Sequence, residues 1–345
     1  MEPNQARGAM RVVHLLPHRA ADELNTTLER MALMTAGYDM HEVVAPKSGA
    51  RGAAWFEFSG WRRAARIKPD IIIARDLDTL AAGVKVKHAT GAKLVYFQHE
   101  AYSWMVENDV PPLVIRWLER RERRLISECD AFVASNPGIL SRLGDTDKPS
   151  AVVMNCRDPQ PTFVSPSPPS RQLYYLGSLH TDRFIKEMVN AMRRVDGTLV
   201  ITGPRTTHSY YDWLATTKHT NVDFRGFVLA QESLDLVLKS DAIVAMLDPS
   251  NRNNCVALGN KVFDAMSFGR AVISTAGTAN GNLVTSLGMG RAVAYNEGAF
   301  ANGVAALLDD DLSRLGKNAY DACSKGVWNW KTQAKELVAL IDSLA

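Results

Sequence analysis

The strongest constraint on the fold is a regular alternation of short apolar runs with longer helical stretches. In the first half the runs are MRVVHLL, HEVVA, DIIIA, KLVYFQ, DAFVAS and AVVMN. The helical stretches between them include residues 25–36, 77–90 and 112–127. Unbroken apolar runs of this length are typical of parallel strands that helices cover on both faces. The alternation therefore predicts βαβ units and an α/β fold.

One segment interrupts this pattern near the middle of the chain. Residues 157–171 read RDPQPTFVSPSPPSR, with five prolines and three serines, and neither a helix nor a strand continues through such a stretch. A second alternation follows, with the runs QLYYLG, GTLVITG, NVDFRG, DAIVAML, RAVIST and RAVAY. The chain of 345 residues is long enough for two cores. We predict domains at 1–158 and 171–345, a linker at 159–170, and a last helix that packs back on the first domain.

Composition and spacing exclude several classes of function. The formal net charge of +3 gives no electrostatic case for nucleic acid. The four cysteines lie far apart, without the spacing of a metal site. LLPHRAAD, which follows the first strand, lacks the glycine fingerprint of a Rossmann dehydrogenase. No apolar run approaches the roughly 18 residues that span a bilayer, and the start of the chain lacks an apolar signal segment. We expect a cytoplasmic protein.

A family resemblance rests on pieces that recur in a fixed order. In the second half these are Gly177 followed by Arg183, then Gly203, VDFRG, Asp241, NKVFDAMSFGRAVI and GRAV. Together they resemble the nucleotide-sugar domain of family 4 glycosyltransferases and their capsule and lipopolysaccharide relatives. DLDTL and HE in the first half resemble the acceptor domain of the same family. The resemblance implies a GT-B architecture, with two Rossmann-like doubly wound domains facing a cleft.

The resemblance also implies a site for a nucleotide diphosphate sugar in the second half. A diphosphate needs cations and backbone amides, and a ribose needs a carboxylate. Glycines after strands let the backbone approach phosphate, and a helix start contributes a partial positive charge. Asp264 takes the position of a family glutamate that contacts ribose. The predicted donor site is Gly177, Arg183, Lys186, Gly203, Arg205, Asn260, Lys261 and Asp264.

The catalytic candidates lie in the first half. His99 and Glu100 follow the run KLVYFQ, at the strand end where the catalytic groups of such sheets gather. Imidazole or carboxylate can take the proton of an acceptor hydroxyl or stabilise an oxocarbenium charge. The alternative is structural: His99 ends the strand and Glu100 pairs with an arginine. Asp76 and Asp78 are predicted to contact the acceptor; because they open a helix, we interpret them neither as a DxD metal site nor as evidence of any metal.

One departure from the family pattern concerns stereochemistry. Retaining members carry a second glutamate where this chain has Val256. Asn253 and Asn254, just upstream, are candidates to bind the sugar in its place, although asparagines in such a segment are usually turn residues. The sequence leaves open whether transfer retains or inverts the anomeric configuration.

Two segments rich in arginine suggest a surface role. Residues 54–68 combine four aromatic residues with Arg62, Arg63, Arg66 and Lys68, and we expect them to contact the inner face of the cell membrane. A core-facing helix with a solvated basic face explains the same composition. In IRWLERRERRL the arginines alternate with Glu119 and Glu122, which predicts ion pairs within one helix.

The expected function is transfer of a sugar from a nucleotide diphosphate sugar to a glycan or lipid-linked hydroxyl, in surface polysaccharide or glycolipid assembly. The transfer is expected to be metal-independent and to need no cofactor beyond this co-substrate. Two alternatives stay open: a nucleotide-sugar epimerase of the same fold, and a non-catalytic protein that binds nucleotides or carbohydrates.

Overall fold

The computed structural model describes residues 9–345 except 22, 48, 145–146, 167–169, 206–207 and 217–220. The chain forms two compact units: unit 1 holds the described residues up to Met154 together with Lys331–Ala345, and unit 2 holds Asn155–Trp330. The boundary therefore comes earlier than predicted, and the end of the chain belongs to unit 1. Hydrogen bonds explain the earlier boundary, because Gln160 donates to Ser267 O at 3.0 Å and accepts from Tyr320 Oη at 2.7 Å. Residues 167–169 of the predicted linker lie outside the described residues.

Unit 1 contains a parallel six-stranded sheet in the order β2-β1-β3-β4-β5-β6. Its strands are β1 (Arg11–Leu16), β2 (Asp39–Val44), β3 (Ile71–Arg75), β4 (Lys93–Gln98), β5 (Ala131–Ala134) and β6 (Ser150–Val152). Its helices are α1 (Leu24–Thr35), α2 (Gly49–Trp55), α3 (Trp61–Arg66), α4 (Asp76–Thr90), α5 (Tyr102–Met105), α6 (Pro112–Ile126), α7 (Pro137–Arg142) and α16 (Trp330–Asp342). A 3-10 turn covers His18–Ala20, and a π-helical turn, Phe56–Gly60, joins α2 to α3.

Unit 2 repeats this architecture with the strand order β12-β11-β10-β7-β8-β9, again all parallel. Its strands are β7 (Gln172–Leu176), β8 (Thr198–Thr202), β9 (Val222–Gly226), β10 (Ala242–Ala245), β11 (Ala271–Thr275) and β12 (Gly290–Val293). Its helices are α8 (Ile185–Ala191), α9 (His208–Thr216), α10 (Ala230–Lys239), α11 (Arg252–Val256), α12 (Asn260–Phe268), α13 (Ala279–Ser286), α14 (Glu297–Leu308) and α15 (Leu312–Lys325). Two 3-10 turns flank α8, at Thr181–Arg183 and Met192–Arg194.

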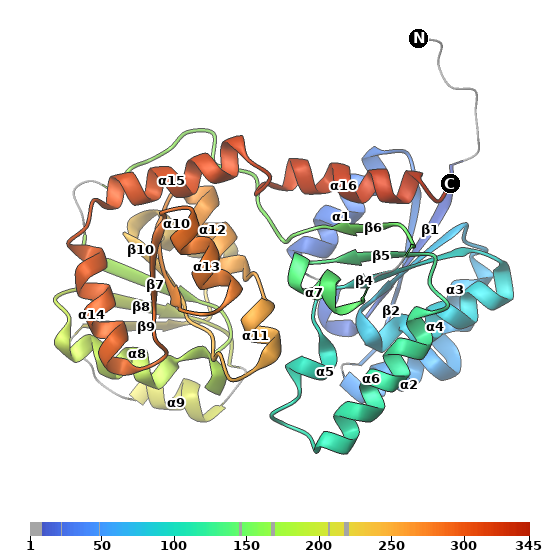
Figure 1. Ribbon diagram of the computed structural model, residues 1–345, viewed down its shortest axis with the longest axis horizontal. Helices are drawn as coiled ribbons and strands as arrows, with labels where there is room; N and C mark the ends of the chain where they lie inside the picture. Colours follow the sequence, from blue (N-terminus) through green and yellow to red (C-terminus); the bar gives the residue numbers. More distant parts are fainter. Residues whose placement is uncertain are drawn as a thin grey trace, which may run out of the picture. The chain divides into compact units, whose positions relative to one another are not determined.

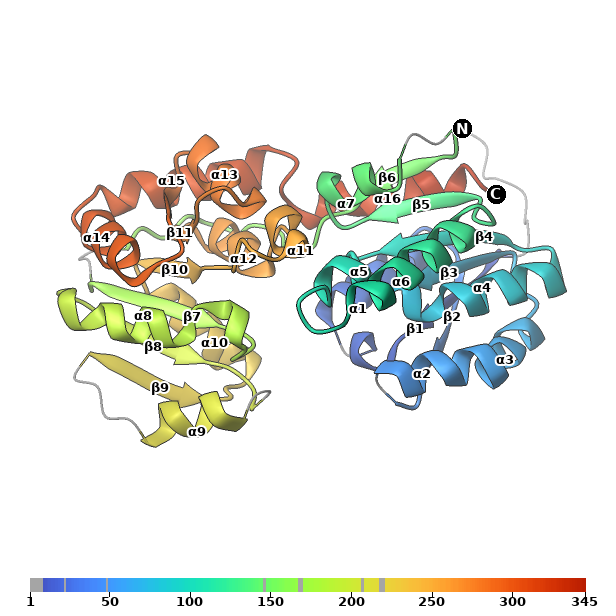
Figure 2. The ribbon, with the colours of Figure 1, turned by 60° about the horizontal axis from the view of Figure 1, so that its bottom comes forward.

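Helices lie on two sides of each sheet (Figures 1 and 2), so the doubly wound α/β fold predicted for both halves is confirmed. The strands form where the apolar runs predicted them, because residues buried from both faces have no polar side to show. All five residues of β3 are buried, and so are all five of β11. Local signals end several helices: Gly91, in the left-handed region at φ 77°, closes α4, and Asn136 caps α7 by accepting from Ile139 N at 2.9 Å.

Residues 54–68 turn most of their aromatic side chains toward the core of unit 1. Phe56 is fully buried, and Trp55 and Trp61 pack against the same core, whereas Phe58 is 75% exposed. Packing of this kind explains the composition of the segment without a membrane. The contact predicted for it would have to rely on Phe58 and the exposed basic side chains.

The acidic residues of α6 are arranged differently from the prediction. Glu122 is 1% exposed and faces inward, where Tyr96 Oη and Gln98 Nε2 donate to its Oε1 at 2.8 and 2.9 Å. Its other oxygen pairs with Arg142 of α7. The predicted ion pairs within α6 are therefore wrong for Glu122, because this carboxylate is the hydrogen-bond acceptor for a buried polar group of β4.

Candidate active site

Three of the predicted donor residues, Gly177, Gly203 and Lys261, lie where β7 and β8 end and α12 begins. Gly177 directly follows β7 with φ 127°, a conformation that favours glycine, and a Cβ there would lie 3.2 Å from Lys261 Nζ. Gly203 follows β8, and a Cβ there would lie 2.1 Å from the carbonyl oxygen of Gly177. The glycines that follow β7 and β8, which carry no side chain, thus lie close to each other and to the first turn of α12.

Lys261, at the start of α12, is a lysine whose ammonium is removed from water. Its ammonium lies 4.7 Å from the centre of the Tyr175 ring, and no carboxylate in the described part of the chain lies within ion-pairing distance of it. Burial and, to a smaller extent, nearby Arg183 lower its pKa to about 7, against the attraction of Asp264 and Asp182. A buried cation without an ion pair, at a helix start and beside glycines, is suited to bind an anion.

Arg183 lies next to Lys261 in the segment between β7 and α8. Its Nε lies 3.4 Å from Asp182 Oδ1, and His180 Nδ1 approaches the same oxygen at 2.8 Å. Although burial opposes ionisation of Asp182, Arg183 and His180 hold the pKa of that carboxyl below its ordinary value. Phe184, which follows, is fully buried and takes the left-handed backbone conformation at φ 60°. A strained bulky residue here fixes the course of the segment that presents Arg183.

Asp264 lies within the same region but has a partner that the sequence did not suggest. It is 5% exposed and pairs with Arg157 Nε. Burial raises the pKa of Asp264, and the guanidinium of Arg157 opposes this. Arg157 is the first residue of the proline-rich stretch, and no local pattern linked it to α12. A ribose that binds Asp264 would share this carboxylate with Arg157.

The remaining predicted donor residues lie on the surface. Asn260 is exposed at the first position of α12. Lys186 Nζ lies over the rings of Tyr210 and Trp213, at 5.0 and 5.8 Å from their centres. Arg205 pairs with Asp212 at 2.7 Å. Lys186 and Arg205 thus contact side chains of α9, and no contact joins either of them to Lys261 in the described part of the chain.

Asn253 and Asn254, considered as replacements for the missing acid at Val256, are buried residues of α11. Asn254 Nδ2 donates to the carbonyl of Asp248 at 3.1 Å and lies 3.4 Å from Asp182 Oδ2. Its side chain therefore ties the loop after β10 to the segment that presents Arg183.

In unit 1, His99 is held by charged neighbours at the carboxyl end of β4. The residue is 8% exposed, and its ring stacks on Phe97 at a centroid distance of 4.3 Å. Arg75 Nη2 lies 3.3 Å from His99 Nδ1, and Glu29 Oε1 lies 3.3 Å from Nε2. Since a guanidinium only donates, Nδ1 acts as the acceptor toward Arg75. Nε2 faces Glu29 but forms no hydrogen bond within the described residues.

Asp76 fixes the backbone of the segment that carries both catalytic candidates. It is 3% exposed, and its Oδ1 accepts from His99 N at 2.8 Å and from Glu100 N at 3.3 Å. Asp76 itself takes the left-handed conformation, at φ 58°. The carboxylate predicted to contact the acceptor is thus turned toward β4, whereas Asp78 and Glu100 are partly exposed.

A buried ionic network underlies this segment, and the sequence reading did not find it. Arg75 is 2% exposed and pairs with Glu23 at 2.6 Å and Glu29 at 3.4 Å. Burial disfavours the charge on Glu29, but Arg75 and His99 bring its pKa below the ordinary value. His14 of β1 is 1% exposed, and burial lowers its pKa to about 3, so it stays neutral. The glutamate at position 29 of α1 could have been recognised only by its unusual place on a buried helix face.

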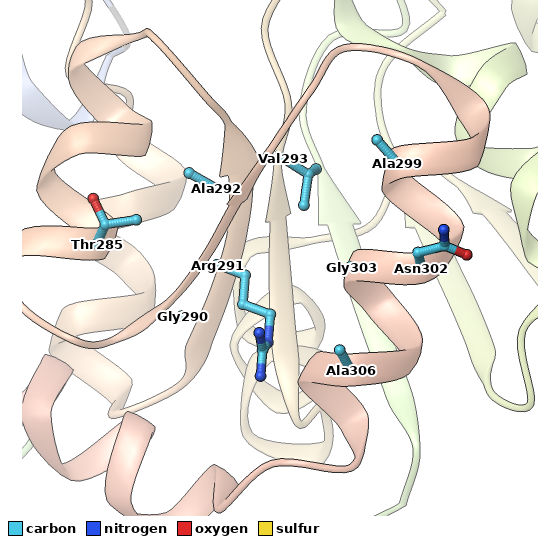
Figure 3. Close-up of a pocket in the computed structure, with 9 residues that line it drawn as sticks. All are labelled: Thr285, Gly290, Arg291, Ala292, Val293, Ala299, Asn302, Gly303 and Ala306. Atoms are coloured by element: carbon cyan, nitrogen blue, oxygen red, sulfur yellow. The ribbon is translucent and has the colours of Figure 1, made fainter.

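A groove of about 460 Å³ lies elsewhere in unit 2, between β12, α13 and α14 (Figure 3). Small residues such as Ala292, Ala299 and Gly303 line it, and Arg291 lies along its floor with its guanidinium paired to Asp310 at 2.8 Å. None of the predicted donor residues lines this groove. Across the described ranges, no group of three or more His, Cys, Asp or Glu side chains could hold a metal ion.

The comparisons with known proteins agree with this geometry. Residues 170–310 match the family model "Glycosyl transferases group 1". The fold is similar to that of sucrose-phosphate synthase from Thermosynechococcus elongatus, with a TM-score of 0.78, 15% identity, and coverage of 97% of this chain and 99% of that one. It is also similar to HepE of Anabaena, solved with UDP and glucose, with a TM-score of 0.73, 14% identity, and coverage of 97% and 100%. No curated protein sequence matches the chain.

One further structural relative is an enzyme of a different class. A putative UDP-N-acetylglucosamine 2-epimerase from Listeria monocytogenes matches with a TM-score of 0.66 and 13% identity, covering 97% of this chain and 96% of its own. At such identities the likeness shows the fold alone, and it is the family match that separates the two classes. Residues 170–310 thus match the glycosyl transferases group 1 family, and the chain as a whole has the GT-B fold.

Proposed function

We propose that unit 2 binds a nucleotide diphosphate sugar with its diphosphate on Lys261 and Arg183, at the ends of β7 and β8. The observation that supports this most strongly is the state of Lys261, a buried ammonium with a pKa near 7 and no carboxylate partner among the described residues. A structural lysine in such a place would be expected to pair with an acid. A diphosphate would supply the missing negative charge, and Gly177 and Gly203 leave room for it.

The uracil nucleotide is the first donor to test, because the HepE structure, similar in fold, holds UDP and glucose. Asp264 is proposed to accept from the ribose hydroxyls while Arg157 holds it in place. The reaction on this proposal needs neither a metal nor a further cofactor, since Lys261 and Arg183 neutralise the leaving diphosphate.

The proposed catalytic segment is His99–Glu100. Because His99 is buried between the charged side chains of Arg75 and Glu29 whereas Glu100 is partly exposed, Glu100 is the better candidate to take the proton of the acceptor hydroxyl. Glu100→Gln is expected to lower kcat at least about a hundredfold, within the usual range for a general base, and to leave donor affinity unchanged. A Glu100→Gln enzyme with wild-type kcat would assign the proton transfer to another group.

The acceptor is proposed to be the hydroxyl of a glycan or of a lipid-linked sugar, in the assembly of a surface polysaccharide or glycolipid on the cytoplasmic side of the membrane. Asp78, partly exposed near the start of α4, stays a candidate contact for it. None of the described helices is both long and apolar enough to cross a bilayer.

Binding calorimetry of UDP, GDP and their sugar conjugates on wild type, Lys261→Met and Lys239→Met tests the donor site. Lys239 is an exposed lysine of unit 2 on α10 and serves as the matched control. Loss of one charge-assisted hydrogen bond predicts about tenfold to a hundredfold weaker binding for Lys261→Met alone. Equal binding by both variants, or none by wild type, would refute the proposed donor site.

Product analysis then separates the three classes of function. A transferase releases nucleoside diphosphate and extends the acceptor, whereas an epimerase converts the nucleotide sugar without an acceptor. Binding without any turnover over a panel of acceptors would favour the non-catalytic alternative. The same assay in excess chelator tests metal independence.

A further inference from the structure

The outer face of α6 combines unpaired arginines with exposed apolar side chains. At a helical spacing of three and four residues, this face carries Leu113, Trp117, Arg120 and Arg124, with Arg116 and Arg123 at its border. Leu113 is 75% and Trp117 is 54% exposed. Core residues of these types are usually buried, whereas no other segment of the described chain buries these two side chains.

The charge on this face is uncompensated. Of the two glutamates that the sequence places among these arginines, Glu122 lies on the opposite side of the helix and pairs with Arg142, and the partly buried Glu119 also acts on the charge of Arg142. Within the described ranges, none of Arg116, Arg120, Arg123 and Arg124 forms an ion pair. Because Glu122 points inward while these arginines are exposed, the outer face of α6 is more cationic than its five arginines and two glutamates suggest from the sequence.

A third exposed apolar side chain, Phe58, lies in the π-helical turn that α6 contacts. Arg121 of α6 pairs with Glu57 of the π-helical turn, and its guanidinium lies 5.3 Å from the centre of the Trp117 ring. The neighbour of Glu57, Phe58, is 75% exposed. The Arg121–Glu57 pair therefore joins the turn that carries Phe58 to α6.

From this arrangement we propose that the α6 face binds the surface of an anionic lipid bilayer. Arginines at the border and along the helix would contact lipid phosphates, while Trp117, Leu113 and Phe58 enter the headgroup layer. An anionic polymer in solution would satisfy the arginines alone, and it would leave the exposed tryptophan and leucine without a role. The apolar side chains are what favour a bilayer as the partner.

The test uses the full chain and sedimentation with vesicles of phosphatidylcholine, either pure or mixed with phosphatidylglycerol. The variant Arg120→Gln/Arg124→Gln removes two charges from the face, and Arg193→Gln/Arg194→Gln removes two exposed charges from unit 2 as a matched control. We expect the α6 variant to bind the anionic vesicles about 30-fold more weakly, the equivalent of about 1 kcal/mol for each arginine, and the control to bind like wild type.

Trp117→Ala distinguishes a bilayer from a soluble polyanion. It should weaken vesicle binding, also at high salt where charge is screened, and leave binding to inorganic polyphosphate unchanged. The proposal is overturned if wild type ignores anionic vesicles at low salt, if both arginine variants lose binding equally, or if Trp117→Ala binds vesicles like wild type. Circular dichroism and UDP binding in unit 2 confirm that each variant is folded.

Discussion

Replacing Lys261 by methionine should strengthen the folded state and weaken the donor site at the same time. Methionine keeps the length of the stem against Tyr175 and removes the charge. The ordinary lysine pKa of 10.5 falls to about 7 because burial disfavours the ammonium. The unfolded chain therefore binds this proton more tightly than the folded chain does, and protonation of Lys261 costs stability.

The size of the effect follows from this pKa difference. At about 1.36 kcal/mol for each pH unit, it corresponds to an upper limit of about 5 kcal/mol below pH 7. Although the ammonium is removed from water, the residue as a whole is partly exposed. Water therefore reduces this cost, and we expect Lys261→Met to be about 2 kcal/mol more stable than wild type at pH 7. The advantage should shrink as the pH rises toward 10.5, where the unfolded chain also loses the proton.

Urea unfolding at about pH 7 and pH 10 measures the stability difference, with Lys239→Met as control. Calorimetry of UDP in buffers of different ionisation enthalpy measures the coupled proton. At about pH 8 wild type should take up close to one proton for each diphosphate bound, at about pH 6 almost none, and Lys261→Met none at either pH. A less stable Lys261→Met, or proton uptake that does not depend on pH, would refute the assignment of Lys261 as a desolvated anion site.

Three further predictions concern packing, positioning and pH. Gly203→Ala should destabilise unit 2 by about 2 kcal/mol and abolish donor binding, because its Cβ would meet the oxygen of Gly177. Asp76→Ala should lower kcat with little change in donor affinity, because the amides of His99 and Glu100 lose their acceptor. Wild type should lose about 2 kcal/mol of stability between pH 7 and pH 5, because His14 has a pKa of 6.5 in the unfolded chain and about 3 in the folded chain. His14→Gln should remove this loss.

Each of these has a control and a result that would contradict it. Gly298→Ala is the control for Gly203, because a Cβ there meets its nearest neighbour at 3.6 Å; equal effects would remove the steric argument. For Asp76, steady-state kinetics should show a change in kcat, and a change confined to KM for the donor would contradict the positioning role. For His14, urea titrations over pH 5 to 7 should give a flatter profile in the variant, and parallel profiles would contradict burial of the neutral ring.

The sequence by itself determined the two parallel sheets and the order of their elements along the chain, and it predicted the residues of the proposed donor site. Apolar runs and helical stretches are local patterns, and alternation leaves few arrangements other than doubly wound sheets. Gly177, Gly203 and Lys261 could be predicted because strand ends and a helix start are themselves readable, and the carboxyl ends of parallel strands meet at one edge.

Tertiary structure alone decided which charged groups meet and which side of a helix they occupy. The pairs Arg157–Asp264 and Arg75–Glu29 join residues that are distant in sequence, and the inward position of Glu122 depends on Tyr96 and Gln98 of a strand. Periodicity gives the face of a helix but not the partner it will have. Burial and the neighbouring charges set the pKa of Lys261. The properties on which the proposed anion site rests therefore exist only in the folded chain.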